Sequence, residues 1–453
     1  MSPSTSATSA TAPRLAWYGD DFTGATDTLA TAAQAGLRSL LFLGVPGAER
    51  LRQAGPLDAV GIAGAARAMA PAEMAAELEP VGRFFAALGA PVVHYKCCST
   101  FDSAPHVGSL GEAIRVLGRH IRGAWVPVVA GQPNIGRYGC FSQLFAAAGA
   151  GGEVHRIDRH PTMSRHPVTP MAEADLRHHL MAQGLASVVG LHYPAYRLPA
   201  DALDAQLARL LAEQPDAVLM DVSGPDDLPA IGRLIWRAAQ RAPLLAVGPS
   251  GVVQALAAHW KAGAEPPVNG SGNELAPAPA EGPVFAFAGS LSPQTAAQVA
   301  AAVSYRQHPV DVRRLLGDTA YASACRDTAL AELATGRHVL LHTDASTRHA
   351  GLDPQAVASA TGELVARVVQ ARAAAGQPLR RIGIAGGDTS SLAVLKLGLW
   401  GLACQGVLAP GVTLCRARSD DPRLDGLELM LKGGQMGPVD MFERLLRPDT
   451  PGA

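Results

Sequence analysis

From Leu15 to about Gly263, short runs of apolar residues alternate with longer segments that are rich in Ala and Leu. The runs are apolar at every position, which is typical of strands covered on both faces, and the longer segments have helical character. Strands that alternate with helices predict a largely parallel sheet of the α/β class. The runs that fit strands include Ser39–Leu43, Pro91–Tyr95, Trp125–Ala130, Ala217–Met220 and Leu244–Val247.

The alternation stops between Gly263 and Gly282, where Pro, Gly, Asn and Ser leave little that a core could bury. This composition is typical of a linker. The α/β pattern then starts again, so the sequence predicts a second α/β domain. Its expected strands are Val284–Ala288, His338–His342, Arg381–Ile384, Val412–Cys415 and Leu427–Leu431, and its expected helices lie near Pro293–Val303, Pro354–Ala374 and Ser390–Leu399.

We therefore predict two α/β domains with largely parallel sheets, separated by a linker. A chain of 453 residues is too long for one ordinary core, which agrees with this division. The first domain is expected to cover residues 14–262, the linker 263–283 and the second domain 284–446. Residues 1–13 are expected to form a disordered tail, and residues 447–453 a second tail.

Charge and cysteine content narrow the kind of partner. The net charge is -1 and only 17% of the residues are charged, so we expect neither nucleic acid nor an anionic membrane as a partner. The 6 cysteines form no CxxC pair, which favours reduced thiols in a cytoplasmic protein. No apolar run approaches the roughly 20 residues of a membrane helix, and the first residues lack the pattern of a signal peptide.

A cluster of carboxylates follows the first apolar run. Asp20 and Asp21 come directly after this run, and Asp27 lies in the segment that follows. In an open parallel sheet, ligands bind at the carboxyl ends of the strands. The acids could orient a hydroxyl, accept its proton or hold a divalent cation. The alternative is that Asp20 and Asp21 only form a turn and cap a helix.

Two further segments carry polar side chains suited to a sugar acid. Lys96 follows an apolar run, and an ammonium there can meet a carboxylate while nearby hydroxyls and a carboxylate meet sugar hydroxyls. The second segment is a proline-rich loop whose Arg165 and His166 could bind an anion, although solvated surface charge would explain them equally well. The polar residues that follow Lys96 are Ser99, Thr100 and Asp102.

Glycine-rich turns mark the second domain. They lie at Gly289–Pro293, Gly386–Ser391 and Lys432–Gly437, and the first two stand between an apolar run and a helix. Backbone N–H groups at such a position can hold a phosphate, and glycine permits close approach. The chain has no GxxxxGK[ST] loop, GxGxxG fingerprint, HExxH or GxSxG motif, which argues against the common NTPases, dehydrogenases, zinc proteases and α/β-hydrolases.

Taken together, the motifs resemble those of the four-carbon acid sugar kinase family. The resemblance covers residues 14–443 and rests on GDDFTGATD, KCCSTFDS, Gly136-Arg137, HPVTPM, GPSG, GSLSP, AGGDT and KGGQMG in that order. It implies an acid-sugar domain before the linker, a nucleotide domain after it and an active site in the cleft between them. It also implies that closure of the domains brings the phosphoryl group to the hydroxyl.

The resemblance assigns roles to individual residues. Asp21 is expected nearest to the accepting hydroxyl, with Asp20 as the alternative. Lys96, Ser99, Thr100 and Asp102 match the sugar-acid motifs of the family. Together with the residues singled out above and in the other shared motifs, the expected sugar-acid set is Asp27, Lys96, Ser99, Thr100, Asp102, Arg137, Arg165 and His166. The expected ATP residues are Ser290, Ser292, Gly386, Gly387, Asp388, Thr389, Gly433 and Gly434.

The implied activity is ATP-dependent phosphorylation of a four-carbon acid sugar with Mg²⁺. The form KCCSTFDS is more similar to the 3-oxo-tetronate branch than to the threonate and erythronate branch. The loop 156–171 and residues 134–138 depart from the tetronate pattern, which makes a branched relative such as 3-oxo-isoapionate a candidate. The alternatives are a threonate or erythronate kinase and a non-catalytic sugar-acid sensor, and a homodimer is a possible assembly.

Overall fold

The computed structural model describes residues 12–149, 151–166, 168–264, 277–344 and 351–448. The strands of the first half are β1 (Leu15–Gly19), β2 (Ser39–Phe42), β3 (Ala59–Ala63), β4 (Val92–Lys96), β5 (Pro127–Ala130), β9 (Val188–Leu191), β10 (Ala217–Asp221) and β11 (Leu244–Gly248). The α-helices of this half are α1 (Phe22–Gln34), α2 (Ala48–Ala54), α3 (Pro71–Leu88), α4 (Leu110–Leu117), α5 (Leu176–Met181), α6 (Ala200–Leu211), α7 (Leu228–Ala239) and α8 (Gly251–His259).

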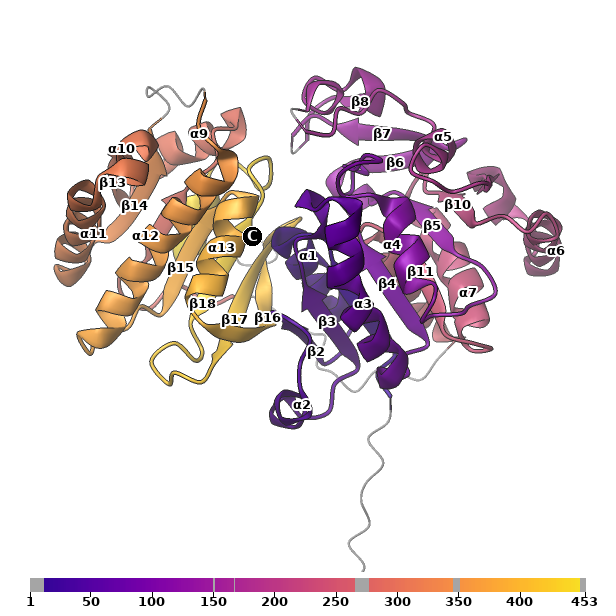
Figure 1. Cartoon of the computed structure of the whole chain (residues 1–453), viewed down its shortest axis with the longest axis horizontal. Coiled ribbons are helices and arrows are strands. Elements are labelled where there is room, and N and C mark those ends of the chain that lie inside the picture. Colours follow the sequence, from indigo (N-terminus) through magenta and orange to yellow (C-terminus); the bar gives the residue numbers. More distant parts are fainter. Residues whose placement is uncertain (1–11, 150, 167, 265–276, 345–350, 449–453) are drawn as a thin grey trace, which may run out of the picture.

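The second half repeats the alternation of strands and helices (Figure 1). Its strands are β12 (Phe285–Ala288), β13 (Tyr305–Val310), β14 (His338–Thr343), β15 (Arg381–Ala385), β16 (Leu399–Ala409), β17 (Val412–Ser419) and β18 (Glu428–Lys432). Its helices are α9 (Pro293–Ala301), α10 (Val312–Gly317), α11 (Thr319–Ala334), α12 (Pro354–Ala374), α13 (Gly387–Lys396) and α14 (Met441–Leu446).

All of these strands belong to one 15-stranded sheet, in the order β13-β14-β12-β15-β18-β17-β16-β2-β3-β1-β4-β11-β5-β10-β9. The strands of the first half pair in parallel, and so do β12 to β15 and β18 of the second half. The antiparallel pairs of the large sheet all involve β16 or β17: β16 pairs with β17, and β17 pairs with β18. The α/β class with largely parallel strands is therefore confirmed. The sequence did not predict β16 or the continuity of the sheet, which passes from one half to the other through antiparallel pairing of β16 with β2.

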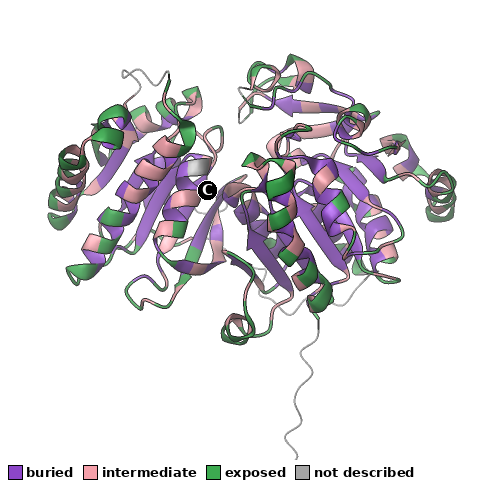
Figure 2. Ribbon diagram, in the orientation of Figure 1, coloured by how far each residue is buried: buried purple, intermediate pink, exposed green. Residues whose placement is uncertain are grey.

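The alternation of side chains along β1 shows why the predicted strands are apolar throughout. Leu15 and Trp17 enter one hydrophobic core, whereas Ala16 and Tyr18 enter another on the opposite face. Both faces of the strand are therefore buried, as its period of two requires. Figure 2 shows the same burial along the strands of both halves, with the exposed residues concentrated on the outer helices.

Several contacts hold the two halves together at the seam between β2 and β16. One core cluster contains residues of both halves, among them Trp17 and Phe287, so apolar packing continues across the seam. The ring of Trp400 on β16 stacks on Phe42 of β2 with centroids 6.1 Å apart. The buried hydroxyl of Thr413 donates a 3.1 Å hydrogen bond to the carbonyl of Thr26 in α1.

A smaller sheet lies beside the first half and was not expected from the sequence. It consists of β6 (Arg137–Cys140), β7 (Gln143–Ala147) and β8 (Val154–Arg156), in that order and antiparallel. Figure 1 shows it above the ends of the strands that carry the first polar segments. The proline-rich loop that follows β8 contains short 3₁₀ turns rather than a long element.

The predicted bounds of an element agree best with the structure where the sequence carries a capping residue followed by proline. Asp353 caps α12 and Pro354 occupies its first position, and the expected helix Pro354–Ala374 has the same bounds. The expected helix Ser390–Leu399 was shifted, because α13 begins at the glycine turn and Leu399 belongs to β16. Residues 265–276 of the predicted linker and residues 1–11 and 449–453 of the predicted tails lie outside the described residues.

None of the helices in the described part of the chain combines the length and apolarity that a membrane crossing requires.

Candidate active site

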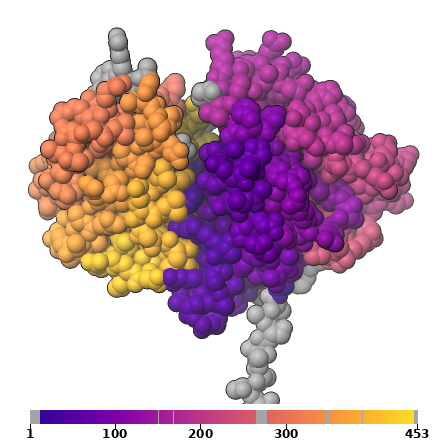
Figure 3. Space-filling model, in the orientation of Figure 1, coloured from indigo at the N-terminus to yellow at the C-terminus, as the bar shows by residue number. Residues whose placement is uncertain are grey.

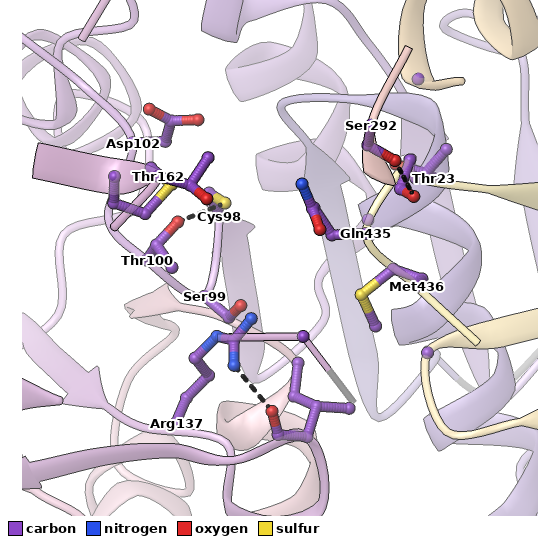
Figure 4. A pocket seen from close by; sticks show the side chains of 18 of the residues that line it. Thr23, Cys98, Ser99, Thr100, Asp102, Arg137, Thr162, Ser292, Gln435 and Met436 are labelled. Carbon is purple, nitrogen blue, oxygen red and sulfur yellow. Dashed lines mark hydrogen bonds between the residues drawn. The ribbon is translucent and has the colours of Figure 1, made fainter. Parts of the chain in front are cut away.

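A cavity of about 630 Å³ lies between the two halves of the molecule (Figure 3). The first half contributes residues that follow β1, β3, β4 and β5, and the second half contributes residues that follow β12, β15 and β18. Figure 4 shows Ser99, Thr100, Asp102 and Arg137 on one side of the cavity and Gln435 and Met436 on the other. The cavity therefore lies where the predicted interdomain site was placed.

Parallel register explains why these segments meet. In the first half, Gly19 pairs with Lys96, so the carboxylates after β1 lie beside the polar residues after β4. In the second half, Ala288 pairs with Ala385 and Ala385 pairs with Lys432. The three glycine-rich turns that follow these residues consequently begin at the same level of the sheet.

Asp21 lines the cavity and also caps α1. Its Oδ1 accepts hydrogen bonds from the Gly24 amide at 3.0 Å and from Arg67 at 2.8 Å, and its Oδ2 accepts from Thr23 at 2.5 Å. The ammonium of Lys96 lies 3.8 Å from Oδ1. Burial acts to raise the pKa of Asp21, but Arg67, Lys96 and the hydrogen bonds outweigh it and lower the pKa to about 2. The capping and functional interpretations of Asp21 are therefore compatible.

Asp20 lies behind Asp21 and is not part of the cavity wall. Its side chain is only 2% exposed, and Arg67 binds both of its oxygens, at 2.7 and 3.2 Å. Burial raises the pKa of Asp20, and the neighbouring guanidinium opposes this effect. The geometry thus gives the two carboxylates different surroundings: Asp20 anchors Arg67, whereas Asp21 faces the cavity.

Arg67 is the site residue that the sequence analysis missed most clearly. It follows β3 and forms ion pairs with both Asp20 and Asp21, so one guanidinium compensates a buried and a partly buried carboxylate. The available signal was its position four residues after the apolar run Ala59–Ala63, but the surrounding alanines suggested only helix-forming composition. Gln132 was missed as well, although its amide donates to the carboxylate of Asp27 at 2.9 Å.

The other predicted sugar-acid residues differ in their placement. Asp102 lines the cavity, accepts a hydrogen bond from Thr169 and lies 3.7 Å from Nδ1 of His166. Arg165 is exposed and does not line the cavity, whereas the adjacent His166 does. The predicted residues that line this wall are Asp21, Asp27, Lys96, Ser99, Thr100, Asp102, Arg137 and His166.

Arg137 presents a positive charge that no described carboxylate neutralises. Its Nη1 donates to the carbonyls of Ile135, Gly136 and Ala147 at 2.8 to 3.3 Å, and its Nε is buried without a partner. Burial lowers the pKa of Arg137, in agreement with the absence of an anionic neighbour among the described residues. A guanidinium in this state favours an anionic ligand.

The opposite wall is built from the glycine-rich turns. Of the residues predicted to bind ATP, Ser290, Ser292, Gly387, Gly433 and Gly434 line the cavity. A Cβ atom added at Gly434 would overlap the hydroxyl of Ser290, so this turn tolerates no side chain there without rearrangement. The carbonyl of Gly434 accepts from Ser292 at 2.6 Å, which ties the first turn to the third.

The second turn contains the remaining predicted ATP residues. Gly386 has φ of +127°, a conformation that favours glycine, and no side chain caps the α13 helix that starts after it. Thr389 is buried against Thr361 and does not line the cavity. The side chain of Asp388 lies outside what the structure describes. No group of three or more His, Cys, Asp or Glu residues in the described ranges is placed to hold a metal ion.

We predict that Arg67→Gln destabilises the protein more at pH 8 than at pH 5. Asp21 has a lowered pKa, so its ion pairs stabilise the fold above the unfolded value of about 4 and are lost as pH falls toward 2. Without Arg67 both carboxylates are left buried and ionised at pH 8, at a cost of about 3–5 kcal/mol. At pH 5 they can take up protons, which relieves their repulsion.

Urea unfolding of both proteins at pH 5 and pH 8 measures this effect. Arg83→Gln, which removes the exposed Arg83–Glu79 pair, is the matched control and should change the midpoint little at either pH. A loss of stability for Arg67→Gln that is the same at both pH values would contradict the assigned role of Arg67.

Comparison with known proteins assigns the chain to a family. A model described as a sugar-binding N-terminal domain matches residues 15–256, and a model described as a nucleotide-binding C-terminal domain matches residues 285–442. The fold is also found in a solved structure from Salmonella typhimurium LT2, with a TM-score of 0.77 at 24% identity over 96% of this chain and 99% of that one.

Two curated relatives extend over nearly the whole chain. A 3-oxo-isoapionate kinase from Paraburkholderia graminis is 40% identical over 450 residues, which cover 94% of this chain and 93% of the relative. A 3-oxo-tetronate kinase from Burkholderia multivorans is 30% identical over 97% of this chain and 98% of the relative. The resemblance inferred from the motifs is confirmed, and the chain belongs to the four-carbon acid sugar kinase family, in which a sugar-binding domain precedes a nucleotide-binding domain.

Proposed function

We propose that this chain, an ATP-dependent sugar-acid kinase by its family, phosphorylates a hydroxyl of a 3-oxo acid sugar and that 3-oxo-isoapionate is its preferred substrate. The relative named for that substrate is 40% identical, whereas the 3-oxo-tetronate kinase from Burkholderia multivorans is 30% identical. The alternative of a threonate or erythronate kinase is less favoured, because the two relatives are named for 3-oxo acids.

The observation that carries the proposal is the contrast between the two walls of the cavity. One wall presents carboxylates, hydroxyls and the cations of Lys96 and Arg137, and the other presents glycine-rich backbone and hydroxyls. Phosphoryl transfer requires mainly that two reactants be positioned and that phosphate charge be neutralised. Polar side chains suit the sugar acid, and main-chain N–H groups beside an uncapped helix start suit the phosphates.

Asp21 is proposed to orient the accepting hydroxyl. Its low pKa keeps it ionised, so it acts as a hydrogen-bond acceptor that directs the hydroxyl oxygen toward the phosphorus atom. The proton of the hydroxyl is then shared with Oδ1 or Oδ2 as the new O–P bond forms, while the bond between the γ-phosphorus and the bridging oxygen breaks and ADP leaves with that oxygen. Arg67 and Lys96 hold this carboxylate in place and limit the build-up of negative charge around it.

The remaining polar residues are proposed to hold the sugar acid. The unneutralised guanidinium of Arg137 is suited to the carboxylate of the substrate. Ser99, Thr100 and Asp102 follow the same strand and can meet hydroxyl groups. This arrangement would place the acid end of the substrate near Arg137 and its accepting hydroxyl near Asp21.

Magnesium is proposed to accompany ATP. Mg²⁺ in kinase sites commonly uses one or two protein carboxylates together with phosphate oxygens, and it neutralises charge on the phosphates. Asp21 and Asp27 are carboxylates of the cavity wall that fit this requirement. Asp21 caps α1 and Asp27 lies in its second turn, and this helix also packs against the nucleotide half.

A screen of ADP release tests the proposed substrate. With ATP and Mg²⁺, kcat/KM should be highest for 3-oxo-isoapionate and about tenfold or more lower for 3-oxo-tetronate, because small differences in a shaped pocket discriminate by roughly 10- to 200-fold. Threonate and erythronate serve as controls without the 3-oxo group. A preference for either control would contradict the 3-oxo assignment, and a thermal shift with ATP but no ADP release would favour a sensor.

Replacement of Asp21 tests its role in turnover. Asparagine is also a good helix cap, so Asp21→Asn should preserve the start of α1 while kcat falls about 10²- to 10⁴-fold. The KM for ATP should change little. Asp58→Asn, which removes a carboxylate paired with Arg38 away from the cavity, is the control. Near-normal turnover of Asp21→Asn would exclude Asp21 from the reaction.

Replacement of Gly387 tests the nucleotide wall. No atom lies within 4 Å of a Cβ added at Gly387, so Gly387→Val should fold normally and place its side chain in the cavity. We expect the KM for ATP to rise about tenfold or more with an unchanged KM for the sugar acid. Gly317→Val, which is equally unobstructed but remote from the cavity, is the control. A change confined to the sugar-acid KM would reverse the assignment of the two walls.

A further inference from the structure

Lys432 lies where the three glycine-rich turns meet. It is the last residue of β18, and the register of the sheet places it beside Ala385, directly before the second turn. The amide of Gly386 donates a 2.9 Å hydrogen bond to the carbonyl of Lys432. Lys432 is also the first residue of the third turn, whose glycines begin at Gly433. Lys432 is therefore in direct backbone contact with two of the three segments that form the nucleotide wall.

The ammonium of Lys432 is buried among neutral groups. Its side chain has no exposed surface, and its Nζ lies 3.1 Å from the carbonyl of Gly433 and 3.5 Å from the hydroxyl of Thr295. The hydroxyl of Thr295 also donates to the carbonyl of Gly434 at 2.9 Å. No carboxylate forms an ion pair with Lys432 in the part of the chain that the structure describes, which is unusual for a buried cation.

The elements packed around Lys432 bring few ionisable groups. The helix α9 brings none, and β15 brings only Arg381 at its opposite end, where Glu428 binds it. From β17 come Cys415 and Arg416, which pair with residues earlier in β18.

Two helices complete these surroundings. The carboxylates of α1, Asp21 and Asp27, are engaged by groups of the first half. On α13, Lys396 in the last turn binds Glu363. The side chain of Asp388 lies outside the described residues.

The nucleotide wall itself carries no positive side chain. Its described lining residues are Ser290, Ser292, Pro293, Gln294, Gly387, Gly411, Gly433, Gly434, Gln435 and Met436, and none of them is Lys, Arg or His. A nucleoside triphosphate nevertheless brings several negative charges to this wall. Lys432 is the buried cation directly behind it.

We propose that Lys432 is a positioning residue for ATP: its neutral amine takes up a proton as the phosphates bind, and the resulting ammonium supplies positive charge from behind the wall and orients the Gly433–Gly434 turn. This inference rests on the proposed function, because it requires ATP to occupy the cavity. The proton comes from solvent and is bound at Nζ, and no covalent bond of the protein changes. The ammonium affects ATP in two ways: it binds the carbonyl of Gly433 and so orients the turn, and its electric field attracts the phosphates.

The direction of the pH dependence follows from burial. Burial lowers the pKa of Lys432 to about 7, so the free protein is partly neutral at this position near neutrality. Phosphate charge nearby stabilises the ammonium and raises the pKa again. ATP should therefore bind most tightly below pH 7, and its affinity should fall about tenfold between pH 7 and pH 8.5 as the free lysine loses its proton.

Proton uptake by the full-length protein provides the first test. The heat of binding of ATP with Mg²⁺ is measured at pH 7.5 in two buffers of different ionisation enthalpy, for the wild type and for Lys432→Met. The wild type should take up about 0.7 more protons per ATP than the variant. Protons exchanged by ATP itself are common to both proteins and cancel in this difference. Equal uptake by both proteins would overturn the inference.

Substitutions distinguish this role from a structural one. Lys432→Met removes a buried charge, so its Tm at pH 6.5 should equal or exceed that of the wild type, while ATP binds tenfold or more weakly and the sugar-acid KM stays unchanged. Lys432→Arg should restore ATP binding and remove its pH dependence, since arginine stays charged. Lys396→Met, which replaces a partly exposed lysine of the same half that does not line the cavity, should bind ATP as the wild type does.

The outcomes separate this inference from the proposed function. If the wild type binds no ATP, the proposed function fails. If the wild type binds ATP and releases ADP with its sugar acid, but its affinity for ATP does not change between pH 7 and pH 8.5, the kinase assignment stands and the role of Lys432 is overturned. If Lys432→Met fails to fold, the proton uptake and pH profile of the wild type still decide.

Discussion

Parallel register is the constraint on which the site depends. Because neighbouring strands run in the same direction, the ends of β1 and β4 are level in one half, and the ends of β12, β15 and β18 are level in the other. Each segment that carries chemistry follows one of these strand ends. Residues far apart in the chain, such as Asp21 and Lys96, are brought together by this pairing rather than by any local motif.

The class of fold and much of the site followed from the sequence for the same reason. Apolar runs bounded by polar or glycine-rich segments mark the strand ends, and most residues selected there line the cavity. The prediction failed where pairing is not encoded locally. The pattern of β16 does not reveal that it joins β2. Arg67 binds Asp21, which is 46 residues away in the chain, and one of the two partners of Lys432 is Thr295, which is 137 residues away. Arg67 stands among alanines that suggest only a helix, and Lys432 stands at a glycine-rich turn that does not reveal its contact with Thr295; only the folded sheet brings these partners together.

The distribution of charge differs between the two walls. On the sugar side, the buried carboxylate of Asp20 and the partly buried carboxylate of Asp21 share the guanidinium of Arg67, and Asp21 faces the cavity. On the nucleotide side, the cavity surface is neutral backbone and hydroxyl groups, and the cation of Lys432 is buried behind it. Lys432 has no acidic partner among the described residues. Buried charges of this kind cost stability, so their presence is better explained by the needs of a charged ligand than by those of the fold.

The pairing of β2 with β16 also determines what would happen if the chain were split into two fragments. If the polypeptide were cut within the linker, each fragment would expose an unpaired strand, β2 on one and β16 on the other, together with apolar surface from the shared core. Such open edges bind other strands readily. The two fragments, produced together, should therefore reassemble by completing each other's sheet, whereas either one produced alone would be left prone to aggregate.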